Sequence, residues 1–411
     1  MDSASARLPD TPRLRVGVLV SHPIQYFAPV YRELATIGDI ELTVVFRSRV
    51  GIDSYYDVQF GRAIKWDIPL IDGYPYVFLS EKRTLRGVET NVVAEIRRRR
   101  FDVLMMHGYS SVTNLLAVLA AKTVGTKILM RGDTRLQKRH QHARARAAFK
   151  RLLFRLIDGF AYIGTLNRDY YSCHGVPDSR LFFAPFCVKN ATFRLPPATR
   201  NDARRQIRED IQVPSDSLVV LFVAKLIRLK RADDLVRAFA LTLSRFPNGH
   251  LLFVGSGSEM SALEELTAKL IPNRAHFVGF KNQAELPALY AASDIFVLPS
   301  AADEWGLVVN EAMAAGLPVI VSDGVGAAPD LVEGKGTGIV YPCGDVAALA
   351  RAIAALEASP RLRSEMAANA ARLIEEWDTP KCAKQIAAAC RALVPRGSGR
   401  AIRGESLEPA P

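Results

Sequence analysis

The stretch DIFVLPSAADEWGLVVNEAMAAGLPVIV, residues 294–321, contains in order a strand, a loop, a helix and a second strand. Residues 295–298 form an apolar run that ends at Pro299, and Gly306 opens an apolar, helix-forming run that stops at Gly316. Strands buried on both faces read as continuous apolar runs, and a helix between two of them is typical of a right-handed crossover in a parallel sheet. The stretch therefore predicts a βαβ unit.

The same alternation of short apolar runs and longer amphipathic runs extends to both sides of this unit. Strands are predicted at 15–20, 41–46, 76–79, 102–107, 127–131 and 159–163 in the first half, and at 219–224, 250–254, 276–278, 294–298, 318–321 and 338–341 in the second. Helices are predicted at 114–124, 148–157, 233–246, 260–270, 285–292, 307–315 and 346–356. The predicted fold class is α/β, with two Rossmann-like domains whose parallel sheets face each other across a cleft.

The boundary between the domains is predicted near residues 186–208, where Pro196-Pro197 interrupts the pattern and a polar, charged stretch at 199–210 follows. We therefore predict domains at 1–190 and 191–375, a helix at 376–394 that crosses back to the N-terminal domain, and a disordered tail at 395–411. Ligands of open parallel sheets bind beyond the carboxyl ends of the strands, so the cleft is the predicted site.

Composition is that of an ordinary globular protein with one strongly basic half. Five scattered cysteines form no C-x-x-C pair, which argues against a disulfide framework or a zinc site. No apolar run approaches the ~20 residues that span a bilayer, so the cytoplasm is the expected location. Residues 1–188 hold 28 Lys and Arg against 17 Asp and Glu, which accounts for most of the overall charge of +12 and suggests an anionic partner for this half.

The loop and helix at residues 303–311 suit a phosphate and a sugar. The helix start at Gly306 presents free backbone N–H groups and the positive end of the helix dipole, which favour a phosphate. Glu311 lies in a mainly apolar run, where a carboxylate without partners is costly and paired sugar hydroxyls could donate to both of its oxygens. A helix capped by Asp303 with an exposed Glu311 explains these residues equally well.

A basic loop at residues 224–231 directly follows a predicted strand and contains Lys225 and Lys230. Two cations at the carboxyl edge of a sheet would neutralise a diphosphate. A solvated basic turn is the alternative. No carboxylate pair with metal-ligand spacing stands out, so no metal site is predicted.

These motifs resemble one known family in their order and spacing. The matching motifs are Phe222-Val223-Ala224-Lys225-Leu226 with Lys230, then Leu252-Phe253-Val254-Gly255-Ser256-Gly257, Val278-Gly279-Phe280, residues 289–300, residues 303–320 and Gly344-Asp345. The set spans residues 219–375 and resembles the retaining glycosyltransferases of family 4, which have the GT-B fold and need no metal. In the first half the matches are the strand ending at His107-Gly108 and residues 182–190.

The resemblance implies that a nucleotide-diphosphate sugar is the donor substrate, with no cofactor, and that its sugar passes to an acceptor hydroxyl with retention. The family's acid-x7-acid motif falls on Asp303 and Glu311, which implies contacts to the sugar hydroxyls and to the ribose, respectively. The other implied donor contacts are Lys225 and Lys230 at the diphosphate, Gly279 and Phe280 at the base, and the backbone of Trp305, Gly306 and Leu307 at the sugar and phosphate.

The chain departs from the family pattern at several places. The family usually has the longer Glu where Asp303 stands, so Glu304 is an alternative contact to the sugar. Lys225 replaces the commoner Arg, which keeps the charge but loses the bidentate fork. Residues 21–26 replace a Gly-rich loop on the acceptor side, so the pattern does not identify the acceptor, a glycan or a lipid-linked molecule.

Two histidines follow predicted strands, where site residues gather. His107 ends a strand at the edge of the cleft, and the resemblance implies a histidine from this region near the reacting sugar. We therefore group His107 with Asp303 and Glu311 as candidate catalytic residues, with a structural histidine as the alternative. His22, just past the first strand, is a further candidate.

Residues 131–155 contain nine Lys and Arg and a single acid. Apolar residues recur there and just beyond at helical spacing, namely Phe149, Leu152, Leu153, Leu156 and Ile157, and cations fall largely elsewhere on the helix, namely Arg144, Lys150, Arg151 and Arg155. Such a helix can lie peripherally on an anionic membrane surface, here the inner face of the membrane. Alternatively, its apolar side packs on the sheet and the arginines are solvated.

Aromatic residues bear on two further predictions. Nucleic acid is not an expected partner, because no stacking aromatics interleave with the cations of the basic half. The aromatic-rich segment at residues 55–78 is predicted either to cover the acceptor side or to pack in the core.

Three other functions fit parts of the pattern. A nicotinamide dehydrogenase is suggested by Gly255-Ser256-Gly257, but Met260 stands where the third glycine belongs. A nucleotide-sugar epimerase of the same fold and a non-catalytic nucleotide-sugar-binding module are closer alternatives. The acid-x7-acid helix favours the transferase over the epimerase, and the shorter Asp303 is what motivates the binding module.

Overall fold

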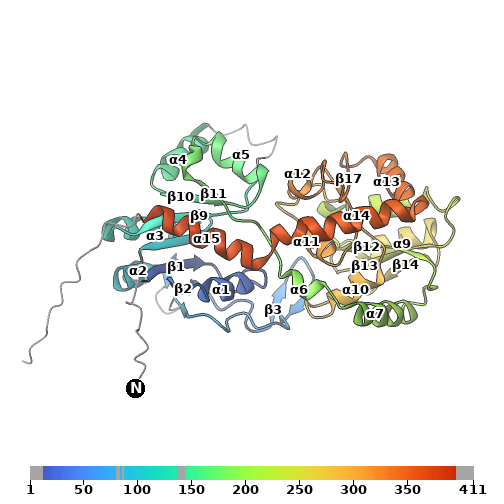
Figure 1. Cartoon of the computed structure of the whole chain (residues 1–411), viewed down its shortest axis with the longest axis horizontal. Helices are drawn as coiled ribbons and strands as arrows, with labels where there is room; N and C mark the ends of the chain where they lie inside the picture. The colour runs from blue at the N-terminus through green and yellow to red at the C-terminus, as the bar shows by residue number, and fades with distance from the viewer. Residues whose placement is uncertain (1–12, 80–83, 86–87, 137–143, 395–411) are drawn as a thin grey trace, which may run out of the picture.

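A computed structural model of the chain describes residues 13–79, 84–85, 88–136 and 144–394. Two α/β domains lie next to each other along the long axis of the molecule, the N-terminal one at the left and the C-terminal one at the right of Figure 1. None of the helices within the described residues is both long and apolar enough to cross a membrane. The tail predicted at 395–411 lies outside the described residues.

The N-terminal sheet has seven parallel strands in the order β11-β10-β9-β8-β1-β2-β5. Its strands are β1 (Leu14–Val20), β2 (Ile40–Phe46), β5 (Tyr76–Phe78), β8 (Val103–His107), β9 (Lys127–Arg131), β10 (Gly159–Tyr162) and β11 (Leu181–Phe183). The helices of this half are α1 (Ala28–Ala35), α2 (Val92–Arg99), α3 (Val112–Val124), α4 (Arg144–Arg155) and α5 (Thr165–Cys173). Two short antiparallel pairs also belong to it, β3 (Tyr55–Asp57) with β4 (Arg62–Ile64) and β6 (Thr84–Leu85) with β7 (Val88–Glu89).

The C-terminal sheet has six parallel strands in the order β14-β13-β12-β15-β16-β17. They are β12 (Leu218–Val223), β13 (Gly249–Val254), β14 (Ala275–Phe277), β15 (Ile295–Leu298), β16 (Val319–Ser322) and β17 (Gly338–Tyr341). The helices of this half are α6 (Asn190–Phe193), α7 (Pro197–Asp210), α8 (Ala232–Ala240), α9 (Met260–Leu270), α10 (Leu286–Ala292), α11 (Leu307–Ala314), α12 (Ala328–Leu331), α13 (Val346–Ala358) and α14 (Pro360–Leu373). Short 3-10 turns lie at Asp178–Arg180, Arg228–Lys230 and Ile374–Trp377.

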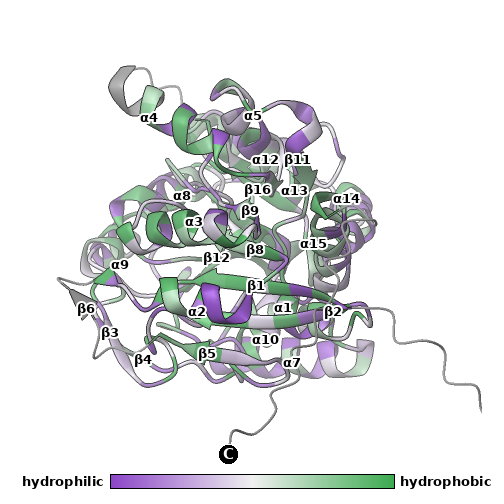
Figure 2. Ribbon diagram, turned by 90° about the vertical axis from the view of Figure 1, so that its left-hand side faces the viewer, coloured by the Kyte–Doolittle hydropathy of each residue, from purple (hydrophilic) through white to green (hydrophobic). Residues whose placement is uncertain are grey.

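The strand prediction is confirmed, with every predicted strand present and its ends within one residue. The reason is burial, since the residues of β13 and β15 are all buried between the helical layers, as parallel strands require. Figure 2 shows the hydrophobic colour along β1, an interior strand of the N-terminal sheet. The strand β11 was not predicted, because its three residues are only half-buried at the sheet edge.

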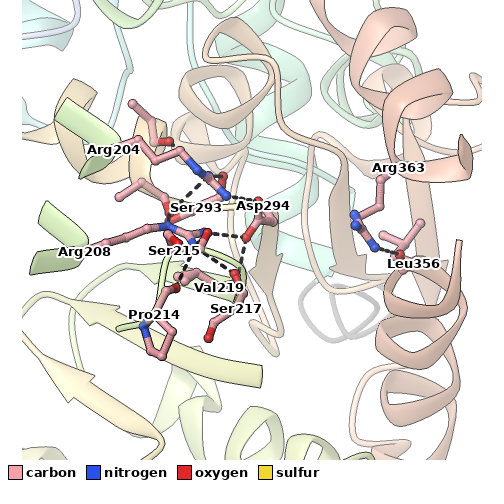
Figure 3. A network of polar contacts seen from close by, with 12 residues as sticks. Arg204, Arg208, Pro214, Ser215, Ser217, Val219, Ser293, Asp294, Leu356 and Arg363 are labelled. Atoms are coloured by element: carbon pink, nitrogen blue, oxygen red, sulfur yellow. Dashed lines mark hydrogen bonds and ion pairs between the residues drawn. The ribbon is translucent and has the colours of Figure 1, made fainter. Parts of the chain in front are cut away.

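The polar stretch at 199–210, which we took to mark the domain boundary, is most of helix α7. Arg208 is only 3% exposed and its guanidinium pairs with Asp294 at 2.8 Å (Figure 3). Arg204 makes a second ion pair with Asp294 at 2.7 Å (Figure 3). The charges that marked the predicted boundary therefore hold a helix on the C-terminal domain.

The helix predicted at 233–246 is shorter than expected, because α8 ends at Ala240 and turns follow. The four turn residues after Leu241 reach Arg245 without continuing the helical hydrogen bonding of α8. Leu241 is 61% exposed, so the apolar spacing that extended the prediction does not mark a buried face there.

The described chain passes between the two domains at two places that touch each other. Val188 on the first crossing forms a β-bridge with Asp378 on the second, and the Asp378 carboxylate accepts from the Asn190 backbone N–H at 3.1 Å. The helix that follows, α15 (Thr379–Leu393), contacts α1, β9, β10 and β11 and belongs to the N-terminal core that also contains β1 and β2. Figure 1 shows this helix, in red, crossing the N-terminal domain.

Candidate functional site

A cavity of about 340 Å³ lies at the carboxyl ends of β12 and β13, where ligands of parallel sheets bind. Both domains line it. The C-terminal domain contributes Val223, Ala224, Lys225, Val254, Gly255, Phe280, Lys281, Gln283, Leu286, Val308 and Glu311, and the N-terminal domain contributes Gln25, Tyr26, Tyr55, Asp57, Phe60 and Trp66. The cavity thus brings together three of the residues predicted to contact a donor, namely Lys225, Phe280 and Glu311.

The two lysines of the basic loop both have acidic partners. Lys225 Nζ lies 3.2 Å from Asp57 Oδ2 of the N-terminal domain and also donates to Gln59 Oε1 at 2.7 Å. Lys230 forms an ion pair with Asp303, and both of these side chains are less than one-fifth exposed. The two lysines are therefore not the free cations of a solvated turn, since each of them pairs with an acid.

Glu311 lies in α11 and is fully buried. Tyr290 Oη donates to its Oε2 at 2.8 Å and Tyr26 Oη to its Oε1 at 3.2 Å. Burial raises the pKa of this carboxyl to about 7, although hydrogen bonds from Tyr290, Tyr26 and Gln283 oppose the rise. The alternative of an exposed helical glutamate is wrong, and Glu311 is a buried carboxyl at the wall of the cavity.

Helix α11 begins after Gly306, whose φ of +92° is left-handed and suits glycine. Leu307 is the first helical residue, so its N–H is one of the free groups at this helix start. Glu304 points to the other domain, where its Oε2 accepts from the Arg135 backbone N–H at 3.1 Å. Asp303 and Glu304 therefore point to different partners, Asp303 to the lysine loop and Glu304 to the N-terminal domain.

The Trp305 side chain belongs to the packing between the domains. Its ring is 3% exposed, stacks on Trp377 at a centroid distance of 5.0 Å, and donates from Nε1 to Asn310 Oδ1 at 2.8 Å. A Cβ on Gly164 of the N-terminal domain would come within 2.4 Å of this ring. The resemblance implied a contact through the Trp305 backbone, whose carbonyl oxygen accepts from the Ala327 N–H at 2.9 Å.

The loop after β14 forms one end of the cavity. Gly279 has a φ of +72°, and its carbonyl oxygen accepts from the Gly255 N–H at 2.8 Å. Phe280 lines the cavity and meets the Phe60 ring edge-on at 5.0 Å. Of the two predicted base contacts, Phe280 therefore lines the cavity, and the Gly279 carbonyl is already bonded within the domain.

His107 lies apart from this cavity, on the N-terminal domain. It lines a second cavity of about 330 Å³ beyond the ends of β8 and β9. Its Nε2 lies 3.0 Å from Tyr31 Oη, its ring stacks on Phe27 at 4.3 Å, and burial, aided by Arg131, lowers its pKa to about 3. His107 is therefore a neutral imidazole at physiological pH, near a small space that Tyr26 also lines.

His22 Nδ1 lies 2.9 Å from Ser21 Oγ, and this histidine lines neither of the two cavities. Within residues 13–394, apart from the undescribed gaps, no three His, Cys, Asp or Glu are grouped to hold a metal ion.

Sequence reasoning missed the groups that surround Glu311 and Lys225. Tyr26 follows the first strand in the segment that replaces the Gly-rich loop, and Tyr290 belongs to a motif read only for its resemblance. Both are tyrosines without any pattern that marks them as partners of a carboxylate. The many aromatic residues at 55–78 were a signal for this region, which we expected at the acceptor side or in the core. Its first part instead contacts Phe280 of the C-terminal domain.

The fold and the site define a two-domain protein of the GT-B type, and comparisons with known proteins agree. A family model described as "Glycosyl transferases group 1" matches residues 203–373, which include every candidate donor residue above. A D-inositol 3-phosphate glycosyltransferase of Streptomyces scabiei is 34% identical over 194 residues, 44% of this chain and 43% of that protein. The chain therefore spans less than half the length of this curated relative.

Solved structures match over nearly the whole chain. HepE of Anabaena, in complex with UDP and glucose, has a TM-score of 0.70 and 18% identity, and the match covers 92% of this chain and 99% of that one. A putative UDP-N-acetylglucosamine 2-epimerase from Listeria monocytogenes has a TM-score of 0.62 and 16% identity, covering 92% and 95%. At such identities these likenesses show the fold, and the chain has the GT-B fold.

Proposed function

We propose that the chain is a glycosyltransferase of family 4, which moves a sugar from a nucleotide-diphosphate sugar to an acceptor hydroxyl. The observation that carries the proposal is the cavity at the ends of β12 and β13, where Lys225, Phe280 and Glu311 meet inside the segment that the family model matches. Its volume of about 340 Å³ lies within the range of roughly 300–1,000 Å³ typical of small-molecule sites.

In the proposed complex the donor lies along this cavity. Lys225 and Lys230 neutralise the diphosphate, with the N–H groups of Gly306 and Leu307 at the start of α11. Glu311 accepts from the ribose hydroxyls, and the base lies by Phe280. The contact between Asp303 and Lys230 supports Asp303 rather than Glu304 for the transferred sugar, because this pair links the acid to the phosphate loop.

The proposed transfer retains the anomeric configuration. The acceptor hydroxyl attacks the anomeric carbon from the face that the diphosphate leaves, the carbon–phosphate oxygen bond breaks, and the hydroxyl proton passes to a departing phosphate oxygen. The two lysines stabilise the charge that develops on that phosphate, which is commonly the largest catalytic contribution. With these cations in place we propose that neither a metal nor a further cofactor takes part.

The second cavity is the proposed acceptor site. It lies in the N-terminal domain, and neutral His107 in its wall can hydrogen-bond a sugar or acceptor hydroxyl without exchanging a proton near pH 7. Tyr26 contacts Glu311 and also lines the small space by His107, so it connects the two halves of the site. We therefore propose that His107 and Asp303 lie at the reacting sugar, and that Glu311, the third candidate catalytic residue, lies at the ribose.

A basic and apolar surface on α4 supports a lipid-linked acceptor at an anionic membrane. Phe149, Leu152 and Leu156 are 54%, 60% and 39% exposed, beside exposed Arg151 and Arg155. Leu153 and Ile157 pack inward, so the helix has a core side as well as this outer side. Lys150 also turns inward, since its Nζ lies over the Tyr170 ring at 5.2 Å.

The function is tested by incubating the protein with labelled nucleotide sugars, with and without glycan and lipid-linked acceptors. We expect slow hydrolysis without acceptor, transfer with a suitable one, retention by NMR, and rates that EDTA leaves unchanged. Interconversion of the free donor would instead identify an epimerase, which the same fold can host. Binding without turnover on any acceptor would identify a binding module.

A thermal shift with UDP, GDP and ADP ranks the bases, because a bound ligand raises stability by mass action.

The membrane proposal has its own test. The protein should sediment with vesicles of phosphatidylglycerol and phosphatidylcholine at low salt, and less in 0.5 M NaCl. Replacing Arg151 and Arg155 by Gln, or Phe149 and Leu152 by Ser, should abolish sedimentation. Equal sedimentation with vesicles of phosphatidylcholine alone would contradict the electrostatic part of the proposal.

A further inference from the structure

The hairpin at residues 55–67, which contains β3 and β4, belongs to the N-terminal domain by sequence but contacts the C-terminal domain. Ser256 Oγ donates to the Phe60 carbonyl at 2.9 Å and Asn282 Nδ2 donates to the Lys65 carbonyl at 2.7 Å. The Ala284 N–H donates to Asp67 Oδ2 at 3.1 Å. Figure 1 shows β3, in blue, at the boundary of the two domains. The hairpin therefore spans the loops that follow β13 and β14.

Aromatic rings from both domains meet under this hairpin. Tyr55, Phe60 and Trp66 line the 340 Å³ cavity from the hairpin side and Phe280 lines it from the opposite domain. Phe60 and Trp66 lie 5.0 and 6.4 Å from the Phe280 ring, and the Arg62 guanidinium lies 5.1 Å from it. Planar rings of this kind form a favourable surface for a flat heteroaromatic base.

The same hairpin places an acid on the cation proposed for the diphosphate. Asp57 Oδ2 and Oδ1 lie 3.2 and 3.3 Å from Lys225 Nζ, and the Asp57 side chain is only 17% exposed. Asp57 Oδ1 also accepts from the backbone N–H groups of Gln59 and Phe60, at 2.9 and 3.0 Å. The hydrogen bonds of its own turn thus hold the Asp57 carboxylate beside Lys225, where it repels any second anion that binds this lysine.

We propose that this hairpin is a specificity element of the donor site. Tyr55 and Trp66 form the wall against which the nucleobase lies, while Asp57 competes with the ligand's diphosphate for Lys225. A ligand with a base gains the aromatic wall and can displace Asp57, whereas a diphosphate alone meets the competition without that gain. The site therefore selects nucleoside diphosphates over inorganic diphosphate. This inference rests on the nucleotide site proposed above.

The aromatic part is tested by calorimetric titration with UDP, GDP, ADP and inorganic pyrophosphate. Trp66→Ala and Tyr55→Ala should weaken the tightest nucleoside diphosphate by about 5- to 150-fold, the range for losing one stacking partner, and leave pyrophosphate affinity unchanged. Trp66→Phe keeps a ring and should restore most of the affinity. Tyr56→Ala is the matched control, because Tyr56 lies on the same strand, is 65% exposed and lines no part of the cavity.

The electrostatic part is tested with Asp57→Asn, which keeps the Oδ1 acceptor of the turn and removes the charge. This variant should bind pyrophosphate at least about threefold more tightly at low salt, and the gain should shrink in 0.5 M NaCl. Asp53→Asn, at an exposed position of the same segment, changes the net charge equally and should have no such effect. No gain for Asp57→Asn, or an equal gain for Asp53→Asn, would overturn the competition at Lys225.

The two proposals fail in different ways. If the wild type, Trp66→Ala and Tyr56→Ala all bind nucleotide with equal affinity, the hairpin's role is overturned and the donor site remains. A wild type that binds none of the three nucleoside diphosphates would overturn the proposed function itself. Tighter nucleotide binding in Trp66→Ala would also overturn this inference, because it would make the hairpin an obstruction instead of a wall.

Discussion

At Glu311, burial and hydrogen bonding act in opposite directions on one carboxyl group, and burial dominates. The pKa is raised from 4.5 to about 7. Between pH 4.5 and pH 7 the carboxyl group is therefore protonated in the native state and ionised in the unfolded state. A raised carboxyl pKa lowers the free energy of unfolding as pH rises through this window. The loss, on the order of 3 kcal/mol, is complete once the pH exceeds about 7.

Glu311→Gln removes this titration and should show it directly. The free energy of unfolding of the wild type and of the variant is measured in urea at pH 5 and at pH 8. From pH 5 to pH 8 the Gln variant should gain on the order of 3 kcal/mol relative to the wild type. Glu357, whose pKa burial also raises to about 7, is present in both proteins and cancels in the difference. A difference independent of pH would show that Glu311 titrates outside this range.

Lys230→Ala removes one of the two cations proposed for the diphosphate. We expect nucleoside diphosphate affinity to fall by about tenfold or more, since a hydrogen-bonded charge contributes roughly 1.5–3 kcal/mol. Removing the lysine also leaves Asp303 without its ion partner, which repels the ligand further. Lys335→Ala, an exposed lysine of the same domain, is the control for net charge. Equal affinities in calorimetric titration would remove Lys230 from the site.

The site residues that lie within the ordered motifs of the sequence were predictable, and the others were not. Lys225, Phe280 and Glu311 were found by that order, and all three line one cavity. Asp57 and Tyr26 were not, because each meets its partner across more than 160 residues of sequence and across the domain boundary. No local spacing encodes such a contact, so only the assembled domains reveal it.

Helix α11 depends on the conformation of the residue before it. Gly306 has a φ of +92°, and a Cβ there would lie 3.1 Å from both Leu298 Cδ2 and Val325 Cγ1. Gly306→Ala should therefore cost about 1–2 kcal/mol of stability for the left-handed backbone, with a further cost for the contact. Because the helix start must shift to relieve it, nucleoside diphosphate affinity should fall as well.

Gly334→Ala separates the two effects. Gly334 has a φ of +68° with no heavy atom within 4 Å of the added Cβ, so this variant carries the backbone cost alone, away from the cavity. We expect both variants to unfold at lower urea concentration and only Gly306→Ala to bind nucleotide more weakly in calorimetry. Unchanged binding by Gly306→Ala would show that the start of α11 does not contact the ligand.

Elements were predictable where burial governs their composition. β15 reads as a strand because its four residues are all buried and apolar. α7 was not predicted as a helix, because its only buried residue is Arg208, whose charge is compensated by Asp294 and by the Ala292 carbonyl, both distant in sequence. A composition-based prediction treats such an arginine as solvated, so it misses a helix such as α7 that polar contacts hold in place.

At the scale of the whole molecule, the last helix ties the two domains together by packing in the first. Ile386 of α15 is 1% exposed and lies in the N-terminal core, so Ile386→Ala should cost about 2–5 kcal/mol in that domain. Amide hydrogen exchange measured by mass spectrometry should quicken in β1 and β2 and stay unchanged in β12 and β13, since the C-terminal core has its own set of buried residues.

Lys384→Ala on the exposed side of the same helix is the control and should leave both sheets protected. Faster exchange in both sheets for Ile386→Ala would mean that the two domains unfold as one unit, whereas no change in either sheet would mean that α15 does not support the N-terminal core.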